Sequence, residues 1–210
     1  MLWPSWSPDD TRIVFADTGS RDLWIIEIDK GDSVRITFDS AHQSSPAWAP
    51  DGSLIAYCVL PVVDNVFGRN DIWVANPDGS NTRMLTDMGD ACSPSWSPDS
   101  RELAFTVFVF SEEPGSDQSD VWIMNRDGTG QRNLTNDPTR FDRNPSWSLD
   151  GTRIAFDSAG PIVGRDDPDL GLVIEHDPPA DVYIMNVTGG PKTRLTTGNE
   201  ADGAPAWRPR

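Results

Sequence analysis

Long apolar runs, histidine and cysteine are all scarce in this sequence, and each scarcity excludes a class of protein. No apolar run is long enough to cross a bilayer, so we expect no membrane-spanning helix. Met1 leads directly into Leu2 and Trp3 without a charged start or an apolar stretch, so we recognise no signal peptide. Two histidines and two cysteines are too few for a histidine-rich metal centre or a disulfide framework.

Positive charge is also in short supply. The sequence has 17 Lys and Arg residues against 33 Asp and Glu residues, for a net charge of −16. Such a surface repels phosphate backbones, so we expect no nucleic-acid partner. It favours cationic partners or divalent cations, although a solvated acidic surface is the simplest interpretation.

What the sequence does contain is one motif repeated along its length. Pro-x-Trp is followed by a turn, an apolar strand, a second strand that begins with Asp, and a short strand that ends in Thr. The motif stands at Pro4-Ser5-Trp6, Pro46-Ala47-Trp48, Pro94-Ser95-Trp96, Pro145-Ser146-Trp147 and Pro205-Ala206-Trp207. Four strands in a repeat of roughly 40 to 60 residues are typical of one propeller blade.

The repeat predicts an all-β fold, a β-propeller of four-stranded antiparallel blades. We name the strands of a blade A to D in chain order, with Pro-x-Trp on strand A. A single domain is expected over residues 1–210. Its four full blades fall at about 1–40, 41–89, 90–138 and 139–199, and an extra strand A falls at 200–210.

The repeated string resembles the WD-repeat-like blade of the TolB family. In the third copy the matching residues are Pro94 to Asp99, Leu103 to Phe105, Asp120 to Asn125, Asp127-Gly128 and Leu134-Thr135. Similar blades occur in TolB, which docks other proteins, in the propellers of prolyl-oligopeptidase-type hydrolases and in oligogalacturonate lyases. The resemblance implies a periplasmic or extracellular location and leaves the function open.

The two ends of the repeat are unusual, because both carry strand A. A closed ring usually splits one blade between the termini, and two copies of strand A cannot complement each other in that way. Three interpretations follow: a fragment of a longer propeller, a strained four-bladed ring, or a homo-oligomer that joins two chains into one larger ring.

Variable loops on a rigid repeat are the usual place for binding. The A–B and C–D turns share one end of the blades and are short. The B–C and D–A loops share the other end, and the B–C loop lengthens along the chain to Asp157–Ala180. Within that loop Asp166, Asp167 and Asp169 are candidate ligands for Ca²⁺, which prefers carboxylate oxygens. The alternative is a solvated acidic loop, since no full calcium-loop motif is present.

Residues just before strand A are expected at the mouth of the central channel, where they form a second candidate binding set. They are His42, Gln43, Asp90, Asp142, Arg143 and Asp202. The aspartates that open strand C recur in every blade, so we interpret them as blade architecture that accepts hydrogen bonds. These repeated residues are Asp22, Asp71, Asp120 and Asp181.

Three further expectations concern single residue types. Cys58 and Cys92 fall on the variable-loop side of neighbouring blades, where a disulfide is conceivable, but we interpret them as buried thiols. Strand C carries tryptophans that are expected in the core, namely Trp24, Trp73 and Trp122. Trp3 and Phe67 lie outside the repeat and are expected as exposed contacts.

The leading functional hypothesis is a non-catalytic protein-interaction scaffold that presents the B–C and D–A loops, with Ca²⁺ as a candidate ligand. One alternative is a partial propeller that assembles with itself in a structural role. The other is a carbohydrate-active or hydrolytic enzyme at the channel mouth, with His42 or His176 as a base. No Gly-x-Ser-x-Gly nucleophile motif is present, so we expect no enzyme.

Overall fold

The computed structural model of the chain describes residues 2–64, 66–110, 117–160, 163–167, 172–176, 179–197 and 202–207. For Leu2 and for residues 163–167 and 172–176 the backbone alone is described. Every regular element in these ranges is a β-strand, and they contain no helix that could span a bilayer.

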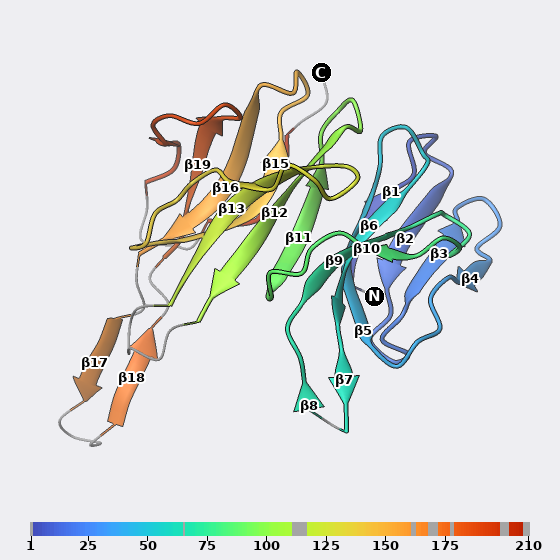
Figure 1. The fold of residues 1–210 in the computed structure, drawn as a ribbon, viewed down its shortest axis with the longest axis horizontal. Helices are drawn as coiled ribbons and strands as arrows, with labels where there is room; N and C mark the ends of the chain where they lie inside the picture. The colour runs from blue at the N-terminus through green and yellow to red at the C-terminus, as the bar shows by residue number, and fades with distance from the viewer. Residues whose placement is uncertain are drawn as a thin grey trace.

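The strands form four antiparallel blades that follow one another along the chain (Figure 1). One parallel pairing, of Ser119 with Phe141, joins blades 3 and 4 into an eight-stranded sheet. Blade 1 consists of β1 (Leu2–Trp6), β2 (Arg12–Ala16), β3 (Leu23–Glu27) and β4 (Ser33–Arg35). Blade 2 consists of β5 (His42–Trp48), β6 (Ile55–Leu60), β9 (Asp71–Ala75) and β10 (Arg83–Met84). Blade 3 consists of β11 (Ala91–Trp96), β12 (Glu102–Val109), β13 (Gln118–Asn125) and β14 (Arg132–Asn133). Blade 4 consists of β15 (Phe141–Trp147), β16 (Arg153–Ala159), β19 (Asp181–Asn186) and β20 (Thr193–Arg194).

Two B–C loops carry hairpins of their own. In blade 2 the hairpin is β7 (Val62–Val63) with β8 (Val66–Phe67), and in blade 4 it is β17 (Val163–Asp167) with β18 (Leu172–His176). Both hairpins project from the same end of the blades, at the bottom of Figure 1. The variable loops therefore gather at one end, as the repeat predicts.

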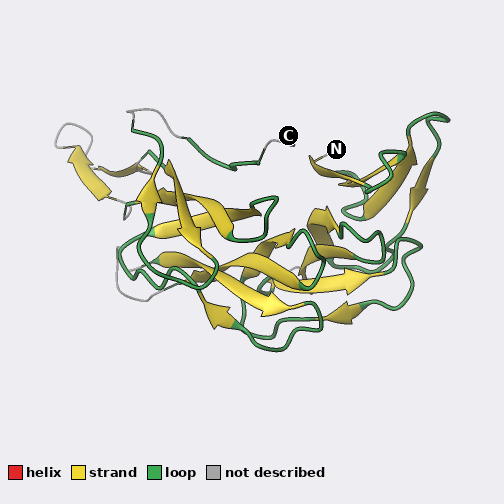
Figure 2. Ribbon diagram, turned by 90° about the horizontal axis from the view of Figure 1, so that it is seen from above, coloured by secondary structure: helices red, strands yellow, loops and turns green. Residues whose placement is uncertain are grey.

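The blades form an open arc, which Figure 2 shows from above. Blade 1 lies at one end of the arc and blade 4 at the other, and residues 202–207 run from blade 4 toward the N-terminal side of the arc. This arrangement confirms the predicted fold class, with sheets that do not close into a ring. The fifth Pro-x-Trp copy, at Pro205–Trp207, differs from the prediction in one respect. It has no strand partner among the described residues, so it is an extended segment and not a strand of a sheet.

Strand A bends at the same place in every blade. The residue before the proline has a positive φ, between 48° and 56°, at Trp3, Ser45, Ser93, Asn144 and Ala204. The pairing of strands A and B shifts register there in all four blades. A β-bulge fits this position, because proline removes a ladder donor. The positive φ departs from the extended conformation that proline ordinarily favours in the residue before it.

The core lies between the blades. Three apolar clusters fill the junctions of blades 1 and 2, blades 2 and 3, and blades 3 and 4. Each contains one strand-A tryptophan, Trp48, Trp96 or Trp147, and each of these is only 6% exposed. The strand-C tryptophans Trp24, Trp73 and Trp122, which the sequence places in the core, are half-buried. Trp73 and Trp122 pack against these clusters at their edge.

Close approach of neighbouring blades also explains a glycine. Gly79 lies in the C–D turn of blade 2 at φ +82°, and a Cβ there would come within 2.1 Å of the Ile36 carbonyl oxygen of blade 1. Only glycine permits both the backbone conformation and the contact.

The aspartates that open strand C form one repeated network. The threonine that ends strand D donates its hydroxyl to the aspartate, and it accepts the backbone N–H of the residue that follows that aspartate. In blade 2 the Thr86 hydroxyl lies 2.8 Å from Asp71 and 2.9 Å from the Ile72 nitrogen. The equivalent pairs are Asp22 with Thr37, Asp120 with Thr135, and Asp181 with Thr196. The architectural interpretation of these carboxylates is confirmed.

Candidate binding surface

The two ends of the blades differ in how their polar groups are satisfied. At the end with the A–B and C–D turns, an aspartate side chain accepts hydrogen bonds from the residue two positions later, as Asp51 does from the Ser53 hydroxyl and N–H. Hydrogen bonds from the Ser7 hydroxyl, two positions earlier, and from the hydroxyl and N–H of Thr11, two positions later, lower the pKa of Asp9 to about 2. Such turns are closed by their own side chains and offer few free groups to a partner.

The opposite end, which we call the variable-loop face, exposes large apolar side chains. In blade 2 the β7–β8 hairpin exposes Val63, Val66 and Phe67, and Phe67 is 59% exposed. In blade 3, Val109 and Phe110 at the end of β12 are exposed, and the Phe110 ring stacks on that of Phe108 with centroids 6.4 Å apart. Apolar side chains that gather on the insertions of neighbouring blades are typical of an interaction surface. The expected exposure of Trp3 and Phe67 is confirmed.

His42 ties one hairpin to the junction of blades 1 and 2. Its ring lies edge-on to Phe67, with centroids 5.4 Å apart, and its Nε2 contacts the Arg21 guanidinium. Burial and the nearby Arg21 charge lower the pKa of His42, so the imidazole is neutral at pH 7. The contact holds Phe67 in place beside a fixed cation.

Three of the six residues predicted at the channel mouth, His42, Gln43 and Asp90, lie at the start of strand A in blades 2 and 3. Gln43 is buried, where its side-chain amide donates to Asp39 and its oxygen accepts the Thr37 hydroxyl. Asp90 accepts the side-chain amide of Asn70 at 2.9 Å.

The other three, Asp142, Arg143 and Asp202, lie in blade 4 and in the segment that follows it. Asp142 is fully buried and forms an ion pair with Lys192, and burial raises its pKa against the opposing effect of Lys192. Arg143 pairs with Asp157 at 3.4 Å. The Asp202 backbone N–H donates to the Ala180 carbonyl at 2.7 Å. The six residues thus lie at successive blade junctions, where contacts within the fold hold them, and their role in binding stays a prediction.

A cavity of about 480 Å³ lies where the strand-A segments meet. All five Pro-x-Trp segments line it, with the bulge residues Ser45, Ser93, Asn144 and Ala204 among them. Its lining has no charged side chain and includes none of the six predicted residues. Sequence reasoning missed these residues because the bulge changes which side chain faces inward, and the recurring position before proline is the signal that marks them.

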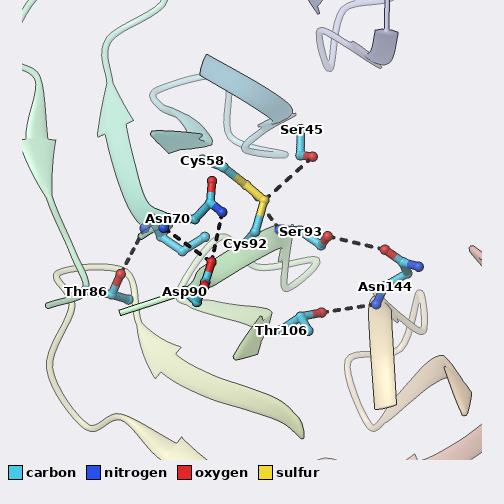
Figure 3. The surroundings of a disulfide bond; sticks show 10 residues. Ser45, Cys58, Asn70, Thr86, Asp90, Cys92, Ser93, Thr106 and Asn144 are labelled. Atoms are coloured by element: carbon cyan, nitrogen blue, oxygen red, sulfur yellow. Dashed lines mark hydrogen bonds between the residues drawn. A yellow bond between two sulfur atoms is a disulfide. The ribbon is translucent and has the colours of Figure 1, made fainter. Parts of the chain in front are cut away.

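A disulfide between Cys58 and Cys92 crosses the junction of blades 2 and 3 (Figure 3). Their Cα atoms lie 5.2 Å apart, with Cys58 on strand B of one blade and Cys92 on strand A of the next. The interpretation of both residues as thiols was therefore wrong. The two strands approach closely enough for a covalent bond, which spacing in the sequence does not reveal.

Hydrogen bonds continue this link toward blade 4. The Ser93 N–H donates to the Cys58 sulfur, and the Ser93 hydroxyl donates to the Asn144 side chain at 3.3 Å. The Asn144 N–H then donates to the Thr106 hydroxyl at 3.2 Å. Figure 3 shows these residues in one series across three blades, so the arc is braced beside its cavity.

The predicted calcium ligands lie at the β17–β18 hairpin. Asp166 and Asp167 belong to β17, where the backbone alone is described, and Asp169 lies outside the described residues. Among the side chains that are described, no three of the His, Cys, Asp and Glu type form a metal-binding group.

Comparison with known proteins finds similarity in structure alone. No protein-family model and no curated protein sequence matches the chain. TolB from Acinetobacter baumannii is 19% identical and superposes with a TM-score of 0.65 over 95% of this chain and 45% of its own. A TolB-type protein of Agrobacterium tumefaciens is 20% identical, with a TM-score of 0.73 over 96% of this chain and 64% of its own. A chain from a nidogen–laminin complex is 16% identical, with a TM-score of 0.72 over 98% of this chain and 67% of its own.

The fold therefore defines the class: the protein is a β-propeller in which the described blades form an open arc. Within that class its blades are TolB-like, as the repeated motif suggests. The chain spans between 45% and 67% of the length of these three structures.

Proposed function

We propose that the protein is a non-catalytic protein-interaction scaffold that binds its partner on the variable-loop face. The observation that carries this proposal is the set of exposed apolar side chains on the B–C insertions of blades 2 and 3. Exposed aromatic residues on a rigid support are typical anchors of protein interfaces. The disulfide and the Ser93–Asn144 hydrogen bond support the proposal further. They link blades 2, 3 and 4, and so fix the positions of the blades that carry these insertions.

The net charge of the protein and its disulfide indicate what kind of partner it binds and in which compartment. A net charge of −16 favours a partner with a basic rim around an apolar centre. A structural disulfide is stable in an oxidising compartment, so we place the interaction outside the cytoplasm.

Paired substitutions test this proposal. The wild-type protein is immobilised and exposed to envelope and secreted fractions of the source cells, and captured proteins are identified by mass spectrometry. The double variant Phe67→Ser, Phe110→Ser is expected to lose at least about 90% of the captured partner, as loss of interface anchors does.

Leu149→Ser is the matched control, because Leu149 is 55% exposed in an A–B turn at the opposite end of the blades. It should retain the partner. Equal capture by the double variant and the control would exclude the variable-loop face.

Calcium binding by Asp166, Asp167 and Asp169 belongs to this proposal as its finer part. Carboxylates in a long loop are the ligands that Ca²⁺ prefers. Titration calorimetry with CaCl₂ should give binding that is lost when all three residues are changed to Asn. Equal heats for the two proteins would remove Ca²⁺ from the proposal.

The enzyme alternative would use His42 as its base. Burial and the nearby Arg21 lower the pKa of this histidine, and its Nε2 contacts the Arg21 guanidinium. A panel of oligosaccharides and esters tests it, since turnover by the wild type that His42→Ala abolishes would replace the scaffold with an enzyme.

A further inference from the structure

Strand D carries an arginine at one register position in blades 2 and 3. Arg83 and Arg132 hold this position, each opposite a buried residue of strand C. In blade 1 the same position, opposite Ile25, is held by Val34. Val34 is short and apolar, and it is 64% exposed. The junction of blades 1 and 2 therefore differs from the next two junctions at one defined place.

At those two junctions the arginine crosses to the C–D turn of the next blade. Arg83 donates to the Arg126 carbonyl at 3.1 Å and to the Asp127 carbonyl at 3.3 Å. Arg132 donates at 2.7 Å to the Val187 carbonyl, which has the place in its turn that the Arg126 carbonyl has. A guanidinium suits this position because its planar fork of N–H groups can reach two carbonyl oxygens at once. The backbone of a C–D turn thus binds a guanidinium twice in this protein.

The C–D turn of blade 2 packs on blade 1 in the same way. A Cβ on the turn glycine, Gly79 in blade 2 or Gly128 in blade 3, would come within 2.1 or 2.9 Å of the carbonyl oxygen just after strand D of the preceding blade. The carbonyl groups of Pro77 and Asp78 therefore correspond to the arginine acceptors of the next turn. Within the part of the chain that the structure describes, no hydrogen bond reaches either of these two oxygens.

A cavity of about 410 Å³ lies between blade 1 and this turn. Its apolar walls are Ile25, Val34 and Ile36 of blade 1 and Pro77 of blade 2. Such walls can cover the methylene groups of an arginine while its charged end reaches polar groups. The cavity is therefore at the place that an arginine of the chain itself fills at the next two junctions.

The two basic residues that line the cavity each have a negative charge beside them. Lys30 forms an ion pair with Glu27 at 2.5 Å. Arg12 lies 3.9 Å from Asp9, and its guanidinium covers the Trp48 ring. These pairs compensate the positive charge of the lining, so it does not repel a further cation.

Two carboxylates in the lining are not compensated in this way. Asp32 and Asp78 line the cavity, and neither has an ion pair with another described residue. Asp78 accepts the hydroxyl and N–H of Ser80 through one of its oxygens, Oδ1. Both aspartates are exposed, so each can meet a cation without the cost of burying a charge.

We propose that this cavity binds an arginine side chain of a partner protein. The guanidinium donates to the carbonyl oxygens of Pro77 and Asp78, and the methylene groups pack on Val34. Asp32 supplies the opposite charge. Free arginine suits the cavity less well, because its own carboxylate would lie near these aspartates. The site lies among the C–D turns, at the end opposite the variable-loop face, so it does not depend on the proposed function.

Peptide titration gives the first test. Acetyl-Gly-Arg-Gly-amide is added to the ¹⁵N-labelled chain, and saturable amide shifts are expected at Val34 and Asp78, with a Kd on the order of 1 mM for a single side chain. The lysine peptide should bind at least about threefold more weakly, because an ammonium cannot span two carbonyl oxygens as a guanidinium does. No shifts at about 10 mM peptide, or equal binding of the lysine peptide, would overturn the proposal. Equal binding of free arginine would overturn the assignment to a protein partner.

Substitution on strand D gives the second test. Val34→Arg supplies in blade 1 the arginine that blades 2 and 3 have, and it should weaken peptide binding at least about tenfold by filling the cavity. Ser33→Arg is the matched control, since it adds the same charge but adjacent strand residues point to opposite faces. It should leave binding within about twofold of the wild type. An equal loss in both variants would mean that charge alone acts, and would contradict the proposed site.

The remaining tests separate the carboxylate from the carbonyl groups. Asp32→Asn should weaken peptide binding about threefold, while Asp29→Asn, which makes the same charge change outside the lining, should not. A crystal structure of Val34→Arg should place the new guanidinium within hydrogen-bond distance of the Pro77 carbonyl oxygen. A guanidinium that points into solvent instead, or equal effects of the two Asn substitutions, would count against the site.

Discussion

Blades 1 and 2 share the same Asp–Thr network but differ in the charge beside it. In blade 1, Arg35 on strand D forms an ion pair with Asp22 at 2.7 Å, and Asp22 is 1% exposed. In blade 2 the equivalent strand-D residue is Met84, so Asp71 keeps the Thr86 hydroxyl and has no arginine at this position. Blade 4 resembles blade 1, with Arg194 beside Asp181.

The difference between blades 1 and 2 distinguishes the role of the threonine hydroxyl from that of the arginine. The threonine hydroxyl joins strands C and D in all four blades, so it belongs to the architecture. The arginine compensates the buried charge of Asp22, and in blade 2 no arginine does so for Asp71. Burial raises the pKa of Asp71, with Asp87 and Asp90 adding to the effect, while the Thr86 hydroxyl opposes it.

The largest effect should come from removing the carboxylate in each blade. Asp22→Ala removes the buried carboxylate that both Arg35 and Thr37 contact, and we expect the free energy of unfolding to fall by about 2 to 3 kcal/mol. Asp71→Ala removes only the hydroxyl contact and should lower it by about 1 kcal/mol. Urea denaturation followed by tryptophan fluorescence measures both. Equal losses would mean that the arginine contributes nothing to the difference.

A smaller effect is expected from giving blade 2 the residue that blade 1 has. Met84→Arg places a guanidinium beside Asp71 and should raise the free energy of unfolding by about 0.5 to 1 kcal/mol, since the pair is partly exposed to solvent. Met84→Gln is the control for side-chain length. The gain should disappear in the double variant Met84→Arg, Asp71→Asn, and a gain that persists there would have another cause.

The Asp–Thr network was predictable from the sequence because it repeats. Asp22 and Thr37 keep their places in the motif, and any hydrogen bond that recurs in each blade leaves such a trace. The exposed Phe67 was predictable for the opposite reason, because it lies outside the repeat.

Features that depend on the relation between blades were not predictable in this way. The Cys58–Cys92 bond depends on how near two strands of different blades approach, and the motif does not encode that distance. The cavity lining depends on a bulge before Pro46 and its equivalents. The extra residue in the bulge shifts the strand register by one, so the side chains beyond it point to the opposite face of the sheet. Trp24 and Trp48 are both flanked by apolar residues, and the stacking of the blades makes Trp48 the more deeply buried of the two.

The smallest effect concerns pH. The half-buried Asp71 and the exposed Asp9 should change the stability of the protein in opposite directions as pH rises. The folded-state pKa of Asp71 is raised, so its favourable contribution is present below the unfolded pKa and is lost as pH rises through the folded pKa. Asp71→Asn should therefore gain in melting temperature relative to the wild type as pH rises from about 4 toward 7.

Asp9 in the exposed turn has a pKa of about 2, so its contribution to the free energy of unfolding is present above the unfolded pKa and is lost as pH falls from about 4 to about 2. Asp9→Asn should lower the melting temperature at pH 7 and make no difference at pH 2. Differential scanning calorimetry of both variants across this range tests the contrast, and parallel pH profiles would contradict it.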